Sequence, residues 1–237
     1  MEEKLSGIVL GGVNFGENDK ILKILTLEKG VISARIKGVK KAGAKLKFAA
    51  EPFSFVEFIF SVRGDMRTVI GASFIDSFYP LRENLEKYFC AGAVIEFAKK
   101  FYKENVNSTE EFMLTVNALK DIAYGDDWLK ALTCYFINAL CDSGFMLSLG
   151  KCACCGHEIL GKTFFDYRRG GFFCERCFDG VGREINNDTF LALSNVQNGK
   201  ETQREWLIKA LKLIKYYIEN RTEEKILSLD ELIKILF

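Results

Sequence analysis

The chain has 237 residues, of which 49% are hydrophobic and 27% charged, and its 33 basic side chains nearly balance 32 acidic ones. This composition suffices for a buried core and excludes a highly charged, disordered chain. A net charge of +1 gives no general attraction to polyanions, so any basic function requires local clustering of charge.

Neither a secretory signal nor a membrane span is expected. The N-terminus carries Glu2 and Glu3 and lacks a sustained apolar run, and later apolar stretches are too short to cross a bilayer. We therefore expect a cytoplasmic protein without a membrane partner. In that compartment the 8 cysteines are core thiols, metal ligands or a redox centre rather than disulfides.

The first part of the chain predicts β-structure. Runs rich in Val, Ile, Phe and Thr alternate with turn residues such as Lys29-Gly30 and Arg63-Gly64-Asp65. The predicted strands cover residues 4–11, 20–28, 31–38, 53–61 and 67–78. Five short strands are too few for an ordinary sandwich and are typical of a small closed barrel of the OB type.

From Pro80 onward the apolar residues recur at helical spacing, so the fold class is α+β. We expect an OB domain at 1–80 and a helical domain at 81–237. Ser108 and Glu111 have the spacing of a capping box, as do Ser228 and Glu231. Helices are expected from residue 81 to about 101, from 108 toward 125, from 126 or 127 to about 141, and then at 188–196, 202–219 and after 228.

Two C-x-x-C pairs, Cys152 with Cys155 and Cys174 with Cys177, are the strongest motif. Their separation falls within the spacing of four-cysteine zinc sites. The segment 162–173 can fold as a hairpin that returns the second pair to the first. Four thiolates leave no open position on Zn²⁺, so we expect one structural zinc ion in an inserted module at about 150–180.

Other residues of this region allow further interpretations. Cys154 is surplus to the four ligands, and the lone His157 is interpreted as a surface residue or a neighbour of the ligands rather than a ligand itself. Uncommitted thiols or redox use remain alternatives. Residues 156–163 also fit the pattern of a phosphate-binding P-loop, but a strand-like sequence follows where a P-loop requires a helix. A nucleotide-dependent enzyme is therefore only an alternative, and no catalytic constellation is evident.

Charge is distributed unevenly near the third predicted strand, because residues 29–50 contain seven basic residues and no acid. Gly38 and Gly43 predict a loop after that strand, on which lysines can follow a phosphate backbone. A loop kept soluble by its lysines is the alternative. The predicted DNA-binding residues are Arg35, Lys37, Lys40, Lys41, Lys45 and Lys47.

Taken together, these residues resemble the bacterial DNA repair and recombination mediator family RecO. The resemblance runs in order along nearly the whole chain: residues 7–10, 15–19, 29–30, the basic stretch ending at Lys45-Leu46, 51–54, 79–82, and the module of Cys152, Cys155-Gly156, Gly170-Gly171, Cys174 and Cys177. Cys154 and the weak overall positive charge depart from the family pattern.

The resemblance implies binding of single- and double-stranded DNA and annealing of complementary strands without ATP. It further implies action with the partner RecR in loading the recombinase RecA onto strands coated with single-strand-binding protein, whose C-terminal tail such proteins recognise. In this chain the family's basic loop and zinc ligands correspond to the residues named above. The alternative function is a protein-interaction scaffold with a structural zinc module and no annealing activity of its own.

Overall fold

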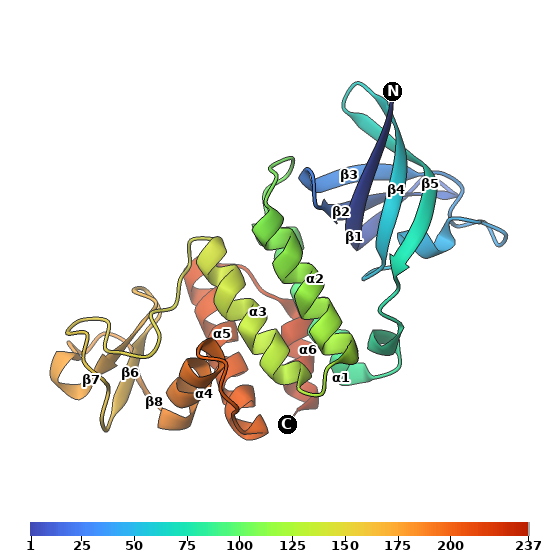
Figure 1. Cartoon of the computed structure of the whole chain (residues 1–237). Helices are drawn as coiled ribbons and strands as arrows, with labels where there is room; N and C mark the ends of the chain where they lie inside the picture. The colour runs from blue at the N-terminus through green and yellow to red at the C-terminus, as the bar shows by residue number, and fades with distance from the viewer. Residues whose placement is uncertain (237) are drawn as a thin grey trace. The chain divides into compact units, whose positions relative to one another are not determined.

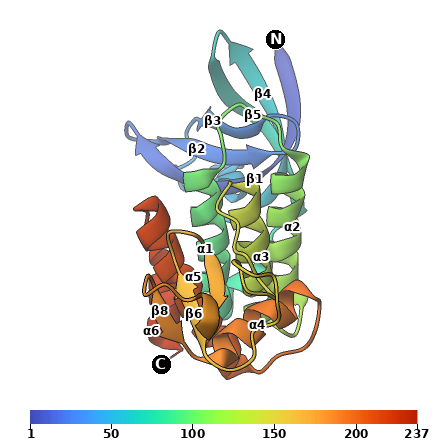
Figure 2. The ribbon, with the colours of Figure 1, turned by 90° about the vertical axis from the view of Figure 1, so that its left-hand side faces the viewer.

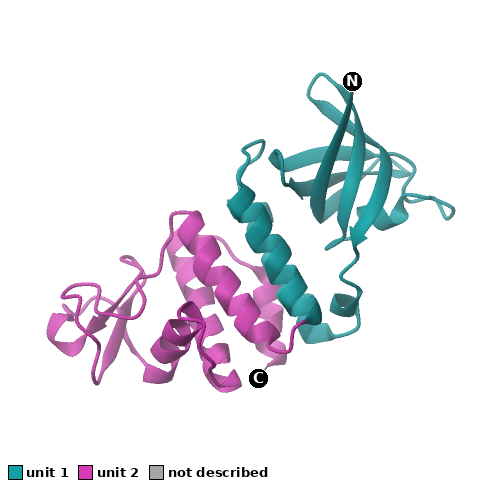
Figure 3. Cartoon of the chain, viewed as in Figure 1, with its two compact units in different colours: residues 1–124 teal, residues 125–237 magenta. Residues whose placement is uncertain are grey.

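The computed structural model describes residues 1–236 and begins with a β-barrel that is followed by helices and a small second sheet (Figure 1). The chain forms two compact units, residues 1–124 and residue 125 onward (Figure 3). The first unit contains the barrel together with helices α1 (Leu85–Phe101) and α2 (Thr109–Tyr124). The predicted domain boundary at residue 80 stays a prediction.

The barrel is closed by five strands, as predicted: β1 (Glu2–Phe15), β2 (Asp19–Thr26), β3 (Gly30–Ile36), β4 (Phe55–Arg63) and β5 (Met66–Asp76). Their order is β1-β2-β3-β5-β4, with β3 and β5 parallel and the other neighbours antiparallel. Alternate residues such as Leu22, Ile24, Phe58 and Phe60 fill the interior. The predicted OB-type fold is confirmed.

Strand β1 is longer than the prediction because glycine allows a bulge where the predicted strand ended. The register with β2 shifts between Val9 and Gly11, and Gly11 has a φ of 139°. Glycine adopts this conformation without a steric penalty, and a bulge bends a strand without ending it. Strand β1 therefore continues to Phe15 and carries this aromatic ring to the first hairpin turn.

Helix α2 starts at the predicted cap: the Ser108 hydroxyl oxygen accepts a hydrogen bond from the Glu111 N–H at 3.3 Å. Before it, the connection from α1 crosses the β2–β3 hairpin, where the Asn105 N–H donates to the Val31 carbonyl at 2.9 Å. This connection adds to the direct contacts of α1 with β1 and β2, which lie in the same compact unit.

The second unit contains helices α3 (Trp128–Asp142), α4 (Asn187–Gln197), α5 (Arg204–Thr222) and α6 (Leu227–Ile235). Asp127 caps α3 by accepting from the Lys130 N–H at 3.0 Å. The second predicted capping box is wrong, because α6 is capped at Ile226 without a side-chain hydrogen bond and Ser228 lies within its first turn. Among the described residues, no helix combines the length and apolar character needed to cross a membrane.

Candidate nucleic-acid interface and four-cysteine cluster

A cationic loop follows β3 at residues 37–47. The side chains of Lys37, Lys40, Lys41, Lys45 and Lys47 are exposed, and none of them forms an ion pair within the part of the chain that the structure describes. The loop is held at both ends, because Val39 is buried in the barrel core and Ala49 is buried after the loop. Successive turns with hydrogen bonds from Lys41 to Gly38 and from Ala44 to Lys41 connect these anchors.

Asp19 organises the start of this loop. Its carboxylate accepts from the Gly38 N–H at 2.7 Å and from Arg35 Nε at 2.8 Å. The backbone hydrogen bond from Gly38, followed by the one from Arg35, holds the pKa of Asp19 below its usual range. Arg35 is thus already paired with a carboxylate, unlike the loop lysines. Sequence reasoning missed this role, although Asp19 stands at the end of the predicted hairpin turn.

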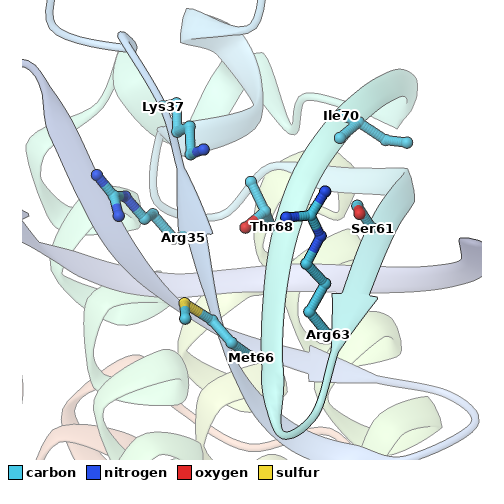
Figure 4. Close-up of a pocket in the computed structure, with 7 residues that line it drawn as sticks. All are labelled: Arg35, Lys37, Ser61, Arg63, Met66, Thr68 and Ile70. Carbon is cyan, nitrogen blue, oxygen red and sulfur yellow. The ribbon is translucent and has the colours of Figure 1, made fainter. Parts of the chain in front are cut away.

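A pocket of about 340 Å³ lies beside the loop and contains a second source of positive charge. Figure 4 shows Arg35 and Lys37 on one side and Arg63, from the end of β4, on the other. The hydroxyl groups of Ser61 and Thr68 also line it. Cations together with hydroxyl groups form a suitable environment for a phosphate oxygen. Arg63 was not predicted as a site residue, and only its place in a hairpin turn could have indicated it.

An apolar pocket of about 350 Å³ adjoins it and is lined by Phe15, Ile21, Arg35 and Met66, among others. The guanidinium carbon of Arg35 lies 4.8 Å from the centroid of the Phe15 ring. The Phe15 ring is 45% exposed, which leaves area for a stacked base. This pocket involves the first and last hairpin turns of the barrel, where OB-folds bind oligonucleotides.

The aromatic residues that lie near the basic stretch in the sequence are mostly unsuited to stacking. Phe53, Phe58 and Phe60 are buried. Phe48 and Phe55 are half-buried and contact Phe74 and Phe112 respectively. Strand alternation explains the burial of Phe58 and Phe60, whose face of β4 belongs to the barrel core. Phe48 lies in the short 3-10 helix at Lys47–Ala50, and Phe53 precedes β4.

The four predicted metal ligands come together on the small sheet of the second unit. This sheet consists of β6 (Thr163–Asp166), β7 (Gly171–Cys174) and β8 (Arg183–Ile185) in the order β7-β6-β8. The predicted hairpin is formed by β6 and β7, and it brings Cys174 Sγ to 4.0 Å from Cys155 Sγ. All four sulfur atoms of Cys152, Cys155, Cys174 and Cys177 lie within 4.8 Å of one another.

These distances fit a metal ion. A tetrahedral ion with metal–sulfur distances of about 2.3 Å has sulfur–sulfur edges of about 3.8 Å. Burial opposes ionisation of Cys152, but the N–H groups of Cys155, Cys174 and Cys154 lower the pKa of its thiol to about 6. Hydrogen bonding with Cys155 and Cys174 raises the pKa of Cys177. When a metal ion binds such a cluster, the thiols release their protons and the cation takes the place of these protons.

The remaining candidates in this region do not join the cluster. The side chains of Cys154 and His157 are both exposed and lie outside the group of four. The P-loop-like segment 156–163 leads into strand β6, so it lacks the helix N-terminus that would face a phosphate. The interpretation of His157 as a surface residue agrees with this geometry.

Strands β6 and β7 are buried on both faces, which explains why each has two consecutive phenylalanines at its centre. Phe164 and Phe173 pack with the cysteines on one face. On the other face, Phe165 lies 5.8 Å from the Tyr217 ring of α5, and Phe172 lies 5.1 Å from the Phe190 ring of α4. A metal ion that holds the cysteines would therefore also stabilise the packing of the sheet on the helices.

The fold and the cluster define a protein with an OB-type barrel and a helical region that contains a four-cysteine module capable of holding a metal ion. Family models of the recombination protein O N-terminal and C-terminal regions match residues 1–78 and 82–230. The chain therefore belongs to the RecO family of DNA repair proteins.

Individual relatives support the same assignment. The chain is 32% identical over 201 residues to DNA repair protein RecO of Anaeromyxobacter sp. (strain K), covering 83% of this chain and 79% of the relative. It is 27% identical over 238 residues to the Acetivibrio thermocellus protein of the same name, covering 96% and 94%. For the Listeria innocua protein the identity is 28% over 221 residues, covering 88% and 86%.

Proposed function

We propose that this protein is a recombination mediator that binds single- and double-stranded DNA and anneals complementary single strands without ATP. The observation that carries the proposal is the row of exposed lysines without ion pairs on the anchored loop at residues 37–47. The pocket that contains Arg63 extends this row across the barrel. The proposed DNA-binding residues are Arg35, Lys37, Lys40, Lys41, Lys45 and Lys47.

The mechanism is electrostatic. Lysines neutralise phosphates of the bound strands and release counterions, which lowers the repulsion between two strands as they meet. An exposed ring such as Phe15 adds stacking that does not depend on the base. The chain makes and breaks no covalent bond in this mechanism, so the proposed function is not enzymatic.

We propose that the cluster of Cys152, Cys155, Cys174 and Cys177 holds one Zn²⁺ ion. Four thiolates are the ligand set of structural zinc sites, and bound zinc would supply no open position for chemistry. Metal analysis of the purified protein tests this assignment, with one zinc per chain as the expected result. A protein that contains no metal and melts unchanged in a chelator would contradict it.

The proposed partners are RecR and the C-terminal tail of single-strand-binding protein. With them the protein would help to load recombinase onto coated strands in the cytoplasm, in association with the nucleoid. These partners rest on the family assignment, whose relatives are named as DNA repair proteins. Within this proposal, residues 1–80 form the DNA-binding domain and residues 81–237 the helical domain.

The deciding experiment is annealing of two complementary oligonucleotides without ATP, first bare and then coated with the cognate single-strand-binding protein, followed by fluorescence. We expect acceleration on both substrates. If folded, zinc-loaded protein accelerates neither, the annealing proposal is wrong. Binding of partners that survives loss of the loop lysines would then favour an interaction scaffold.

A further inference from the structure

A groove of about 380 Å³ in the second unit is lined mainly by residues of strand β8 and helix α5. Figure 2 shows the backbones of these two elements. The lining of the groove includes the basic residues Arg183, Lys209 and Lys212, the ring of Tyr216, and an apolar floor formed by Ile185 and Leu213. The groove is separate from the four-cysteine cluster, and the proposed function does not use it.

Two arginines are stacked on tyrosines beside this groove. The guanidinium carbon of Arg183 lies 4.5 Å from the centroid of Tyr216, and that of Arg168 lies 5.9 Å from the centroid of Tyr167. The two tyrosine rings meet edge to face at 5.8 Å, so the four side chains form one continuous array. Both arginines are exposed, and among the described residues no carboxylate lies within ion-pair distance of either.

The neighbouring acids already have cationic partners. Glu184, which also lines the groove, lies 3.6 Å from Lys162, and Asp188 lies 2.7 Å from the ammonium group of Lys209. The array is thus locally cationic although the whole chain is almost neutral.

We propose that this groove binds a second single strand of nucleic acid. An arginine that stacks on a ring presents its N–H edge to phosphate oxygens and its free face to a base. The apolar floor can accommodate part of a base, which an acidic peptide would not require. The inference extends the proposed function, because annealing brings two strands together on one molecule.

The test counts binding sites on the full-length protein by titration with fluorescent oligo(dT) of about six nucleotides, a length within the site size of one OB-fold. We expect two oligonucleotides per wild-type chain and one per R168E/R183E chain. The barrel variant K40A/K41A/K45A/K47A should also bind one. K200E/K225E, which changes two exposed lysines outside the groove by the same charge, should bind two.

The charge-preserving variant R168K/R183K is a control for misfolding caused by the charge reversal in R168E/R183E. It keeps the cationic charge but loses planar stacking, so its affinity at the groove should fall about fivefold. Unchanged affinity in this variant, or two oligonucleotides bound by R168E/R183E, would overturn the inference and leave the barrel proposal intact. If the barrel variant still bound two oligonucleotides while R168E/R183E bound one, the groove would be supported and the proposed barrel site would be wrong.

The remaining alternative is an acidic protein partner. If a polyglutamate peptide binds through Arg168 and Arg183 while oligo(dT) fails to displace it, the groove is a protein-binding site and the nucleic-acid inference is overturned. Displacement of the peptide by oligo(dT) would support the inference.

Discussion

At the residue scale, Gly30 links the barrel to the helices of the first unit. It has a φ of 64°, and a Cβ atom placed there would lie 1.9 Å from the carbonyl oxygen of Val106. The obstacle is backbone, so no flexible side chain can move aside. Only glycine satisfies both the turn conformation and this close approach.

We therefore expect Gly30→Ala to destabilise the first unit strongly. The left-handed conformation costs about 1–2 kcal/mol for alanine, and the overlap costs about 1–3 kcal/mol more. Gly16→Ala is the matched control, because Gly16 has a φ of 63° but no atom within 4 Å of its Cβ position. Denaturant unfolding gives the free energy of unfolding of both variants. Equal decreases in the two variants would show that the close approach to Val106 does not affect stability.

Asp19 predicts a pH dependence. Its pKa is lowered in the folded state by the Gly38 N–H and Arg35, so its contribution to stability is present above the unfolded value near 3.8 and is lost as the pH falls through the lower folded value. Wild type should have a higher melting temperature than Asp19→Asn at neutral pH, and this difference should shrink as the pH falls below the unfolded value near 3.8 and through the lower folded value. Asp65→Asn, in an exposed turn, controls for the removed charge. A gap that is constant with pH would contradict this role for Asp19.

At the scale of elements, the loop at residues 37–47 predicts a salt effect. If each of Lys40, Lys41, Lys45 and Lys47 contacts one phosphate of a single strand, replacing all four by Ala should flatten the slope of log K against log salt by about 2.8. The control replaces four exposed lysines elsewhere, Lys99, Lys103, Lys120 and Lys200, by Ala. Equal slopes for the two variants would place the DNA contacts outside this loop.

The cysteine module predicts a selective response to metal loss. Cys174→Ser should remove the zinc ion, whereas Cys154→Ser, which changes an exposed thiol outside the cluster, should retain it. A loss of even 2 kcal/mol would lower the melting temperature of a unit of this size by about 8–16 °C. Metal content and thermal melting measure both effects, and equal zinc content in the two variants would contradict the ligand assignment.

The elements of this fold were largely predictable from sequence because their signals are local. Alternation of apolar and polar residues predicts the five strands, and the cap at Ser108 and each of the two C-x-x-C pairs lie within a few residues of chain. The contributions of Asp19, Arg63 and Phe15 were not predictable in this way. Strand pairing and barrel closure place these three residues beside the cationic loop. Such contacts connect residues that are distant in the sequence.

Tertiary contacts also explain why the predicted cap of α6 is wrong. Ser228 and Glu231 have the correct spacing, but Ile226 and Leu229 are buried, so apolar packing determines where the helix begins. Tertiary contacts commonly override a weak capping preference. The groove beside α5 likewise requires β8, whose three residues carry almost no strand signal in the sequence.

At the scale of the whole molecule, the barrel and the cysteine module have separate clusters of buried residues. The barrel interior is filled by its own residues, including Leu5, Val9 and Phe60, whereas the cysteine module packs on helices of the second unit. Both tryptophans, Trp128 and Trp206, belong to the second unit, so tryptophan fluorescence reports on that unit alone. Damage to the barrel core can therefore be tested separately from damage to the cysteine module.

This separation predicts the behaviour of Cys174→Ser in DNA assays. The barrel core contains no residue of the cysteine module, so binding of a short oligonucleotide through the loop lysines should stay within about threefold of wild type, since few contacts of that site change. Annealing should fall much further, because the groove beside α5 depends on the sheet that the cysteines hold. Tryptophan fluorescence should report the loosened second unit in the same sample. If binding and annealing were lost together, the barrel would require the metal module for its own structure, and the two units would not be functionally separable.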